Sequence, residues 1–424
     1  MQISLIIPVW YGQEVIGQCL TAVYQHATPA LHEIICVDNG APDNAPALIA
    51  AQFPQVRLLP QPVNLGFAGG VNAGMAAATG DVFVLLNQDC LVHEGWLTAV
   101  THTFSQNPNA AILGGTLYNA DGSVNHAGAV IQKPLGYGQH LTAVPATNQP
   151  QPIEYVTGAL YAIRRSAWQK IGPMDEGFYP AYFEESDYCY RARQHGFDVL
   201  YVPDLAGTHL FSSRQWQKDP VRHNIHQHRA RYRFISKHFA ATELADFFQA
   251  ETAALTADTY HDQTIGRFIA AQHTLRDLPH ILTSRQHDLA QTTSVAHARH
   301  LYVGFRHLSQ QAWQKWQQPT DLTHQLAASH KRLQNLRQQE YDILSRIYFR
   351  APNATEPETA VQRLWRLIKR PFSLLTLRDY FLQAQLNTLH VARLDEMAQR
   401  QQLLEQQHHH HLRLLEIAAQ YAHD

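Results

Sequence analysis

The sequence predicts an α/β fold over roughly the first 235 residues, followed by an α-helical C-terminal region. In the first part, short apolar runs alternate with amphipathic stretches and with turns rich in Gly, Pro and Asn. This alternation is typical of βαβ units with a mostly parallel sheet. Beyond about residue 240, Gly becomes rare and Gln, His, Leu and Ala dominate, which favours helices. A length of 424 residues also exceeds one typical domain.

Composition excludes several classes of protein. A hydrophobic content of 45% argues against wholesale disorder. With 33 Lys and Arg against 35 Asp and Glu, the net charge of -2 argues against nucleic-acid binding by bulk charge. No apolar stretch is long enough to span a bilayer, and we expect residues 1–10 to form a buried strand rather than a signal peptide. The four cysteines form no CxxC pair, which fits a cytoplasmic protein without disulfides or structural zinc.

Strands and helices can be assigned in order along the first ninety residues. Four β-rich runs are expected to form strands, at residues 3–9, 33–39, 55–61 and 82–89. Amphipathic stretches at 14–26 and 42–53 predict the helices between the first three strands. Ligands of such sheets bind beyond the carboxyl ends of the strands. The polar residues that follow these strands are therefore candidates for function, namely Asp38, Asn64 and Asp89.

Two of these strand ends have a structural as well as a functional interpretation. The carboxylate of Asp38 is suited to accept a hydrogen bond from a uracil or thymine ring, but it is equally suited to stabilise a turn. Asp43 or Asn44 would cap the next helix better. Asp89 follows a buried strand, where a divalent cation bound to a nucleotide diphosphate would need a carboxylate oxygen. A solvated turn is the alternative for that residue.

The stretch from Asn64 to Gly74 is rich in small residues, which let a backbone approach a ligand closely and open a helix toward an anion. It contains neither the GxGxxG fingerprint nor a Walker loop. Farther along, acidic and aromatic residues crowd the stretch 174–188. Aromatic walls with carboxylates suit a sugar and a general base, and clustered carboxylates raise one another's pKa. Asp187 and Arg191 are also spaced to form a surface ion pair on a helix.

His209 follows the β-rich run 199–203 and comes soon after the acidic stretch, so it is a candidate metal ligand. The order of all these motifs resembles the family 2 glycosyltransferases. The motifs are PVWYGQEVIGQCL, VDNGAPDN, NLGFAGGVNAG, LLNQD, TGALYAIRR and MDEGFYPAYFEESDYCYRARQHG, followed by the histidine. The sequence is most similar to the rhamnosyltransferase-like branch, which adds sugars to bacterial surface polysaccharides, over residues 1 to about 235.

The resemblance implies a GT-A fold, which is a Rossmann-like mixed sheet flanked by helices, and it implies a role for each matching residue. Base-binding positions of the family correspond to Pro8, Tyr11 and Asp38, with Asn39 beside them. Positions under the ribose and diphosphate correspond to Asn64, Phe67, Asn72 and Asn87. The metal-binding D-x-D corresponds to Asn87-Gln88-Asp89, with Asn in the first place, and His209 to the third metal position. The catalytic pair corresponds to Glu184-Glu185, in which Glu185 replaces the usual Asp base and Glu184 or Asp187 could share its role.

The implied activity is metal-dependent transfer of a hexosyl group with inversion. A Mg or Mn ion would neutralise the departing nucleoside diphosphate while Glu185 takes the proton of the acceptor hydroxyl. The likeness favours dTDP-rhamnose as the sugar donor, and the acceptor is expected to be a saccharide or a lipid-linked saccharide. Two alternatives stay open, namely a catalytically degenerate domain that acts as a scaffold and a nucleotidyltransferase. The latter is disfavoured because no Arg- or Lys-bearing Gly-rich loop follows the first strand.

The chain is expected to divide into a GT-A domain at 1–238, a helical domain at 239–350, a linker at 351–360 and a helical segment at 361–424. A leucine and isoleucine stripe makes 321–349 a candidate coiled-coil helix that could form a homodimer. Residues 363–378 carry basic and aromatic but no acidic side chains. They suit peripheral contact with an anionic membrane at the inner face of the plasma membrane, although ordinary helix packing is the alternative.

Overall fold

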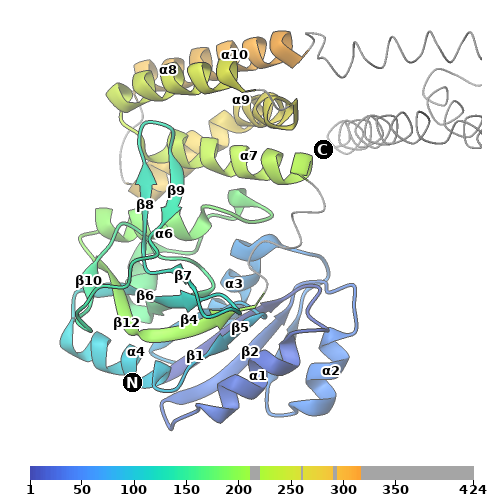
Figure 1. The fold of residues 1–424 in the computed structure, drawn as a ribbon, viewed down its shortest axis with the longest axis vertical. Helices are drawn as coiled ribbons and strands as arrows, with labels where there is room; N and C mark the ends of the chain where they lie inside the picture. The colour runs from blue at the N-terminus through green and yellow to red at the C-terminus, as the bar shows by residue number, and fades with distance from the viewer. Residues whose placement is uncertain (211–219, 259–260, 290–293, 317–424) are drawn as a thin grey trace, which may run out of the picture. The chain divides into compact units, whose positions relative to one another are not determined.

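The computed structural model describes residues 1–210, 220–258, 261–289 and 294–316 (Figure 1). Met1–Trp316 form one compact unit, and Gln317–Asp424 form a second unit that lies outside the described residues. The candidate coiled-coil helix, the linker, the last helical segment and the basic stretch 363–378 all belong to that second unit. In the described ranges, no helix is long and apolar enough to cross a membrane.

The first part of the chain forms the expected alternation of strands and helices. Its elements in order are β1 (Ile3–Val9), α1 (Ile16–Gln25), β2 (Leu31–Asp38), α2 (Ala45–Gln52), β3 (Arg57–Pro60), α3 (Gly66–Ala77) and β4 (Val82–Leu86). β1 pairs in parallel with both β2 and β4, and β2 pairs in parallel with β3. The four predicted strands and two predicted helices are confirmed; β1 has the predicted bounds, β2 begins two residues earlier, and the other elements are shorter. The carboxyl ends of these strands consequently meet at one edge of the sheet.

The rest of the sheet is mixed, which confirms the mixed sheet that the GT-A resemblance implied, whereas the mostly parallel sheet expected from the alternation of strands and helices extends only to β4. The next elements are β5 (Cys90–Val92), α4 (Trp96–Gln106), β6 (Ala110–Tyr118), β7 (Val124–His126), β10 (Gln151–Pro152), β11 (Leu160–Arg164) and β12 (Asp198–His209). β11 lies between β4 and β6 and is antiparallel to both. A short apolar run predicts a buried strand but carries no information on its direction.

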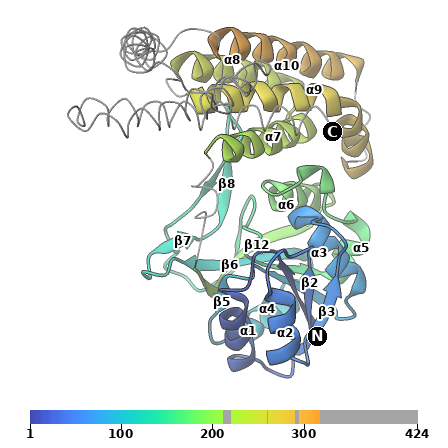
Figure 2. The same cartoon turned by 90° about the vertical axis from the view of Figure 1, so that its right-hand side faces the viewer.

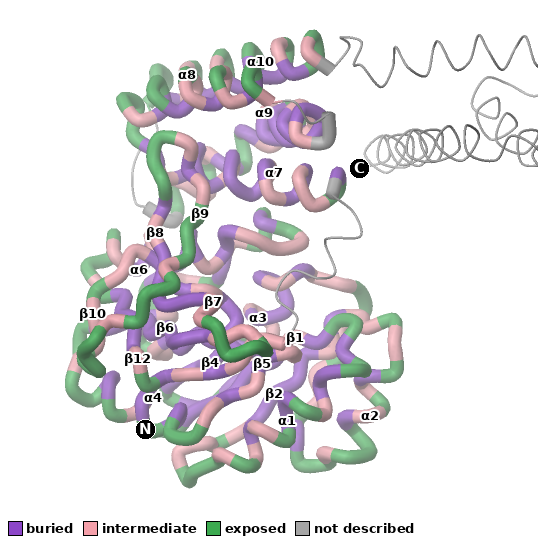
Figure 3. The backbone as a smooth tube through the Cα atoms, viewed as in Figure 1, coloured by how far each residue is buried: buried purple, intermediate pink, exposed green. Residues whose placement is uncertain are grey.

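Apolar side chains cover both faces of this sheet. One buried cluster joins α1 and α4 to one face, and a second joins α3 and the later helices to the other. β4 is buried along its whole length and β6 over all but its last residue, which Figure 3 shows as the buried centre of the unit. Burial on both faces explains why these strands are continuous apolar runs instead of alternating patterns.

A helical layer completes the compact unit. It consists of α7 (Pro220–His238), α8 (Ala241–Ala257), α9 (His261–Leu289) and α10 (Val295–Trp316). α9 packs against α7 and α10, and α10 packs against α8. Figures 1 and 2 show this layer on the side of the sheet that carries α6 (Glu184–Gln194) and the hairpin of β8 (Ala129–Gln132) and β9 (Tyr137–His140). The division at residue 238 stays a prediction.

Candidate active site

The loops after β1 and β2 and before α3 are joined by side-chain amides; we call residues 10–13, 38–43 and 63–67 the amide loops. Asn39, which is 3% exposed, accepts a hydrogen bond from the Leu65 amide at 2.9 Å. Its amide nitrogen donates to Asn64 Oδ1 at 3.1 Å and to the Gly66 carbonyl at 2.9 Å. A Cβ on Gly70 would lie 3.1 Å from that nitrogen, so a larger residue there would press on the Asn39 side chain. The predicted residues Asn39 and Asn64 are therefore brought together.

Gln88 connects a second pair of loops. Its side chain accepts from the Trp10 amide at 2.9 Å and donates to the Trp10 carbonyl at 2.7 Å. Tyr11, the next residue, has a positive φ of 53° and is 49% exposed. A backbone conformation of this kind in a non-glycine residue is strained and needs support from its surroundings. The two hydrogen bonds between the Gln88 side chain and the Trp10 backbone supply that support for the residue that follows.

Asp38 forms a turn, as the structural alternative anticipated. Its Oδ1 accepts a hydrogen bond from the Ala41 amide at 2.9 Å. Asp38 is the last residue of β2, so this turn lies at the carboxyl end of the strand. Asp43 accepts from the Ala45 amide at 3.2 Å near the start of α2, and from the Gln13 amide at 2.9 Å. Pro8 pairs in register with Val37 on β2 and so lies in the same edge.

The N-x-D motif and His209 meet although they are far apart in the chain. His209 Nε2 lies 3.1 Å from Asp89 Oδ1 and 3.4 Å from Asn87 Nδ2. The antiparallel pairing of β12 with β5, which puts His209 opposite Cys90, fixes this meeting. The side chains of His209 and Asp89 are 14% and 18% exposed, so they are accessible to a small ligand. The structure brings together three of the predicted site residues here.

The acidic segment, defined as residues 175–187, carries the predicted catalytic pair at the first turn of α6. It begins with η1 (Glu176–Phe178) and ends in α6. Tyr182 and Phe183, directly before the pair, have positive φ values of 85° and 68°. Together with Tyr11, they are the non-glycine residues with positive φ in the described part of the chain. Strained residues of this kind cluster at functional sites, which supports a role for both places.

The environment of the acidic pair raises the pKa of both carboxyls. Burial raises the pKa of Glu185 to about 7, although its own amide and that of Ser186 donate hydrogen bonds that oppose the shift. Burial and the neighbouring Glu185 charge hold the pKa of Glu184 well above its usual range. Glu184 Oε2 is buried without a hydrogen-bond partner. A carboxyl with a pKa near neutrality is suited to exchange a proton during catalysis.

Gly158 and Ala159, directly before β11 (Leu160–Arg164), lie next to residues of both the acidic pair and the N-x-D motif. A Cβ on Gly158 would lie 3.0 Å from the Phe67 ring and 3.9 Å from Glu185 Cβ. The neighbouring Ala159 carbonyl accepts a hydrogen bond from the backbone N–H of Asn87 at 3.0 Å. Phe67, Glu185 and Asn87 therefore surround one short piece of backbone, although they come from three separate motifs.

Two predicted site residues are engaged elsewhere. Asn72 donates to the Met174 carbonyl at 2.9 Å and to Glu176 Oε1 at 3.0 Å, which joins α3 to the acidic segment. Asp187 is fully buried and ion-paired with Arg191, and the structure does not bring it to the exposed edge. The pair with Arg191 has the predicted spacing, but the expectation of a surface pair is wrong. Tertiary packing of α6 against α7 covers the helix face that carries it.

The sequence interpretation missed two contributions. Gln88 was passed over as the middle of the N-x-D motif, and Lys237, on α7, contacts Asp187. Residue spacing predicts neither contact, because side-chain hydrogen bonds and buried ion pairs between segments remote in the chain follow no sequence period. The strained positions before Glu184 also carry no signal in residue type.

Asp89 and His209 fit a divalent ion. Ligand atoms bound at right angles about 2.1 Å from an octahedral ion are about 3 Å apart, which matches the 3.1 Å between Asp89 Oδ1 and His209 Nε2. Carboxylate oxygen suits Mg²⁺ and Mn²⁺, and imidazole suits transition metals, so the pair favours Mn²⁺. In the part of the chain that the structure describes, no group of three or more His, Cys, Asp or Glu side chains is arranged for a metal.

The mixed sheet with helices on both faces and a polar carboxyl edge defines the architecture as the GT-A fold of glycosyltransferases. A crystal structure of GalNAc-T7 with UDP, GalNAc and Mn²⁺ matches with a TM-score of 0.50 at 16% identity. The match covers 67% of this chain and 57% of that chain, and at this identity it shows the fold alone.

The family model Glycosyl transferase family 2 matches residues 4–172. The N-acetylglucosaminyl-diphospho-decaprenol L-rhamnosyltransferase of Mycobacterium tuberculosis is 27% identical over 236 residues, covering 50% of this chain and 76% of that protein. Glycosyltransferase AglE of Haloferax volcanii is 23% identical over 214 residues, covering 49% and 66%. The chain therefore contains a family 2 glycosyltransferase domain, which confirms the resemblance derived from its motifs.

Proposed function

We propose that this domain transfers a hexosyl group from a nucleotide-diphosphate sugar to an acceptor hydroxyl by a single displacement that inverts the anomeric centre. The observation that carries the proposal is the meeting of Phe67, Glu185 and Asn87 around Gly158-Ala159. This arrangement supports a site in which Glu185 acts together with Asn87, Asp89 and His209. Similarity to a rhamnosyltransferase favours dTDP-rhamnose as the sugar donor. A saccharide or lipid-linked saccharide of a surface polysaccharide is the proposed acceptor.

The amide loops are proposed to hold the nucleotide. Pro8, Tyr11, Asp38 and Asn39 would surround the base, because they lie where β1 and β2 end at the same sheet edge. Asn64, Phe67, Asn72 and Asn87 would lie under the ribose and the diphosphate. The network of neutral amides supports this proposal, since it fixes the loops in place before a nucleotide arrives and so lowers the entropic cost of binding.

Asp89 and His209 are the residues proposed to hold a Mn²⁺ or Mg²⁺ ion, with Asn87 beside them. When bound, the ion would neutralise the charge of the departing nucleoside diphosphate. The amides of the loops and the side chain of Asn87 would orient the diphosphate. Metal dependence is thus part of the proposal.

Glu185 is proposed to accept the proton from the attacking hydroxyl. Its partial burial raises its pKa, which makes it a stronger base than an ordinary glutamate. The neighbouring Glu184 would stay protonated, because two adjacent buried carboxylates repel one another. The pair then contains one proton acceptor and one neutral neighbour.

Turnover by the purified chain tests the proposal. Release of nucleoside diphosphate from a panel of dTDP-, UDP- and GDP-sugars with Mn²⁺ is expected for at least one sugar. Glu185→Gln should lower that rate by about 10²–10⁴-fold. Glu94→Gln removes an exposed carboxylate and serves as the matched control, with a wild-type rate expected. Unchanged turnover in Glu185→Gln excludes this residue as the base, and no turnover with any sugar favours the scaffold alternative.

A further inference from the structure

Two carboxylates bracket the acidic segment, and one ammonium group binds both of them. Lys237 Nζ, near the end of α7, lies 2.8 Å from Asp175 Oδ2 and 2.7 Å from Asp187 Oδ1. The side chains of Lys237 and Asp187 are 0% exposed, and that of Asp175 is 9% exposed. The first and last residues of the segment are thus joined through a helix that follows the matched part of the sequence.

Every charge in this contact has further partners. Arg233 binds Asp175 through two nitrogens at 2.8–3.0 Å, and Ser284 donates to Asp175 at 3.3 Å. Arg191 and His238 contact Asp187 at 3.0 and 2.8 Å. Burial raises the pKa of Asp187, but the charges of Lys237 and Arg191 outweigh it and hold the pKa well below its usual range. Both carboxylates are therefore ionised, and the contact is a true ion-pair network.

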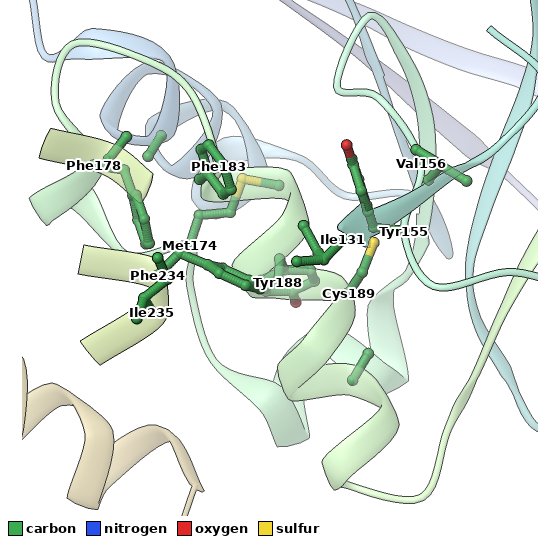
Figure 4. Packing of buried hydrophobic residues seen from close by; sticks show 14 of the residues in the cluster. Ile131, Tyr155, Val156, Met174, Phe178, Phe183, Tyr188, Cys189, Phe234 and Ile235 are labelled. Carbon is green, nitrogen blue, oxygen red and sulfur yellow. The ribbon is translucent and has the colours of Figure 1, made fainter. Parts of the chain in front are cut away.

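In the described part of the chain no ion pair holds the acidic pair, although the Glu185 carboxyl accepts hydrogen bonds from its own amide and that of Ser186. Glu184 Oε2 has no hydrogen-bond partner, and the backbone before it is strained at Tyr182 and Phe183. The ends of the segment and the packing of α6 hold the backbone that carries the pair. Figure 4 shows that packing, in which Tyr188 and Cys189 of α6 lie among buried side chains that include Phe234 and Ile235 of α7.

We propose that Lys237 is a positioning residue, which closes the acidic segment by binding Asp175 and Asp187 at once and thereby holds Glu185 in its working place. This inference rests on the proposed function, since it assigns a role relative to the proposed base. It gives the helical layer a part in catalysis, because α7 supplies the closing charge. Breaking a buried pair leaves an uncompensated charge, so loss of Lys237 would open the segment to water.

The helical layer contains a second buried network that offers a control. Glu251 of α8 is bound by Arg231 of α7 and, at 3.0 Å, by Arg267 of α9, and Arg267 also contacts Asp258 at 2.6 Å. These contacts join α7, α8 and α9 and include no residue of the acidic segment. Arg267→Met therefore disturbs a buried ion pair of the same kind without touching the segment.

The experiment measures kcat, KM for the nucleotide sugar and the pH dependence of kcat/KM in Lys237→Met. We expect kcat to fall by about 10²-fold, as for a misplaced catalytic group, with KM unchanged. The acid limb should move from its wild-type midpoint toward the ordinary Glu value of about 4.3, because water enters around Glu185. Arg267→Met should lower the melting temperature while keeping the wild-type acid limb.

The charged and titratable groups around Lys237 and around Glu185 determine how a shift of the acid limb is assigned. Lys237 faces Asp175, Asp187, Arg191, Arg233, His238 and Arg285. The residues whose charges interact with Glu185 are Glu184, Tyr155, Tyr161, Tyr182 and Cys189. The pKa values of Asp175 and Asp187 are lowered by their cationic neighbours, and burial lowers the pKa of His238 despite its bond to Asp187. Burial raises the pKa of Glu184 and brings that of Glu185 to about 7.

Asp187→Asn with Lys237→Met removes one buried charge of each sign, and it serves as the second variant if Lys237→Met does not fold. It should show the same shift of the acid limb. A wild-type limb in a folded variant overturns the positioning role, and so does failure of both variants to fold, since Lys237 would then serve the whole fold. A wild-type chain without turnover is a different outcome, which contradicts the proposed function itself.

Discussion

The amide loops and the acidic segment lie at the same edge of the sheet but are held by different forces. Asn39, Asn64 and Gln88 join the amide loops through neutral hydrogen bonds to backbone groups. Asp175, Asp187 and Lys237 hold the acidic segment through buried charges. The amide side chains do not titrate, whereas burial and neighbouring charges shift the pKa of the carboxyls in the acidic segment. Under the proposed function, separate parts of the domain would therefore support binding and proton transfer.

A large effect is expected at the proposed metal pair, Asp89 and His209, which belongs to neither region. Asp89→Asn removes the carboxylate of the proposed metal pair, and chelation with EDTA removes the ion. Each is expected to lower turnover by about 10²–10³-fold, the loss typical for one electrostatic contact to the reacting groups. Titration of Mn²⁺ into the chelated wild type should restore the rate, whereas Asp89→Asn should need far more Mn²⁺. Full turnover in EDTA would show that the domain works without a metal.

The pH dependence separates the two regions next. If Glu185 must be ionised, kcat/KM rises with pH with a midpoint near 7, and it is about 50-fold lower at pH 5 than at pH 7. Binding of the nucleotide should change little over the same range, because the amide side chains of Asn39, Asn64 and Gln88 that hold these loops do not titrate. A flat rate profile between pH 5 and 8 contradicts Glu185 as the base.

The free energy of unfolding should also depend on pH, and the contribution of Glu185 should fall as pH rises, whereas kcat/KM rises. The raised pKa of Glu185 means that the folded chain binds more protons than the unfolded chain between about pH 4.3 and 7. This carboxyl therefore makes the fold less stable as pH rises through that window. Asp187, whose pKa is lowered, contributes stability that is present above its ordinary value and is lost as pH falls. Melting temperatures of Glu185→Gln across pH should lack the first effect and keep the second.

A smaller effect is expected from the amide loops. Asn39→Ala leaves the Leu65 amide and the Gly66 carbonyl without their partner, which costs about 2–3 kcal/mol of unfolding free energy. Affinity for the nucleotide should fall with it, while the pH profile of the remaining turnover stays unchanged. Asn44→Ala, at an exposed position with no side-chain capping bond, is the matched control. A shifted pH profile in Asn39→Ala would show that the two regions are coupled.

The smallest effect belongs to Gln88. Gln88→Ala removes two hydrogen bonds to Trp10 at an exposed place. We therefore expect the free energy of unfolding to fall by about 1 kcal/mol and KM for the nucleotide sugar to rise several-fold. The value of kcat should stay near that of the wild type. A fall in kcat with KM unchanged would assign Gln88 to the reacting groups instead.

The sequence predicts what depends on local pattern. The strand that ends at Asp38 and the turn residues after it follow from apolar runs and turn chemistry, and the order of motifs predicts that Asp89 and His209 meet. The role of Lys237 could not be predicted, because an ion pair between α6 and α7 depends on how the helices pack. The direction of β11 and the hydrogen bonds made by Gln88 also depend on tertiary contacts that no period in the sequence records.

The separation of binding from proton transfer is tested most directly by titrating a nucleotide sugar, with Mn²⁺, into Glu185→Gln and measuring turnover on the same preparation. The account predicts a dissociation constant equal to that of the wild type within error, together with a loss of turnover of at least about 10²-fold. A weakened dissociation constant with turnover retained would contradict it, since Glu185 would then belong to the binding site and not to the chemistry.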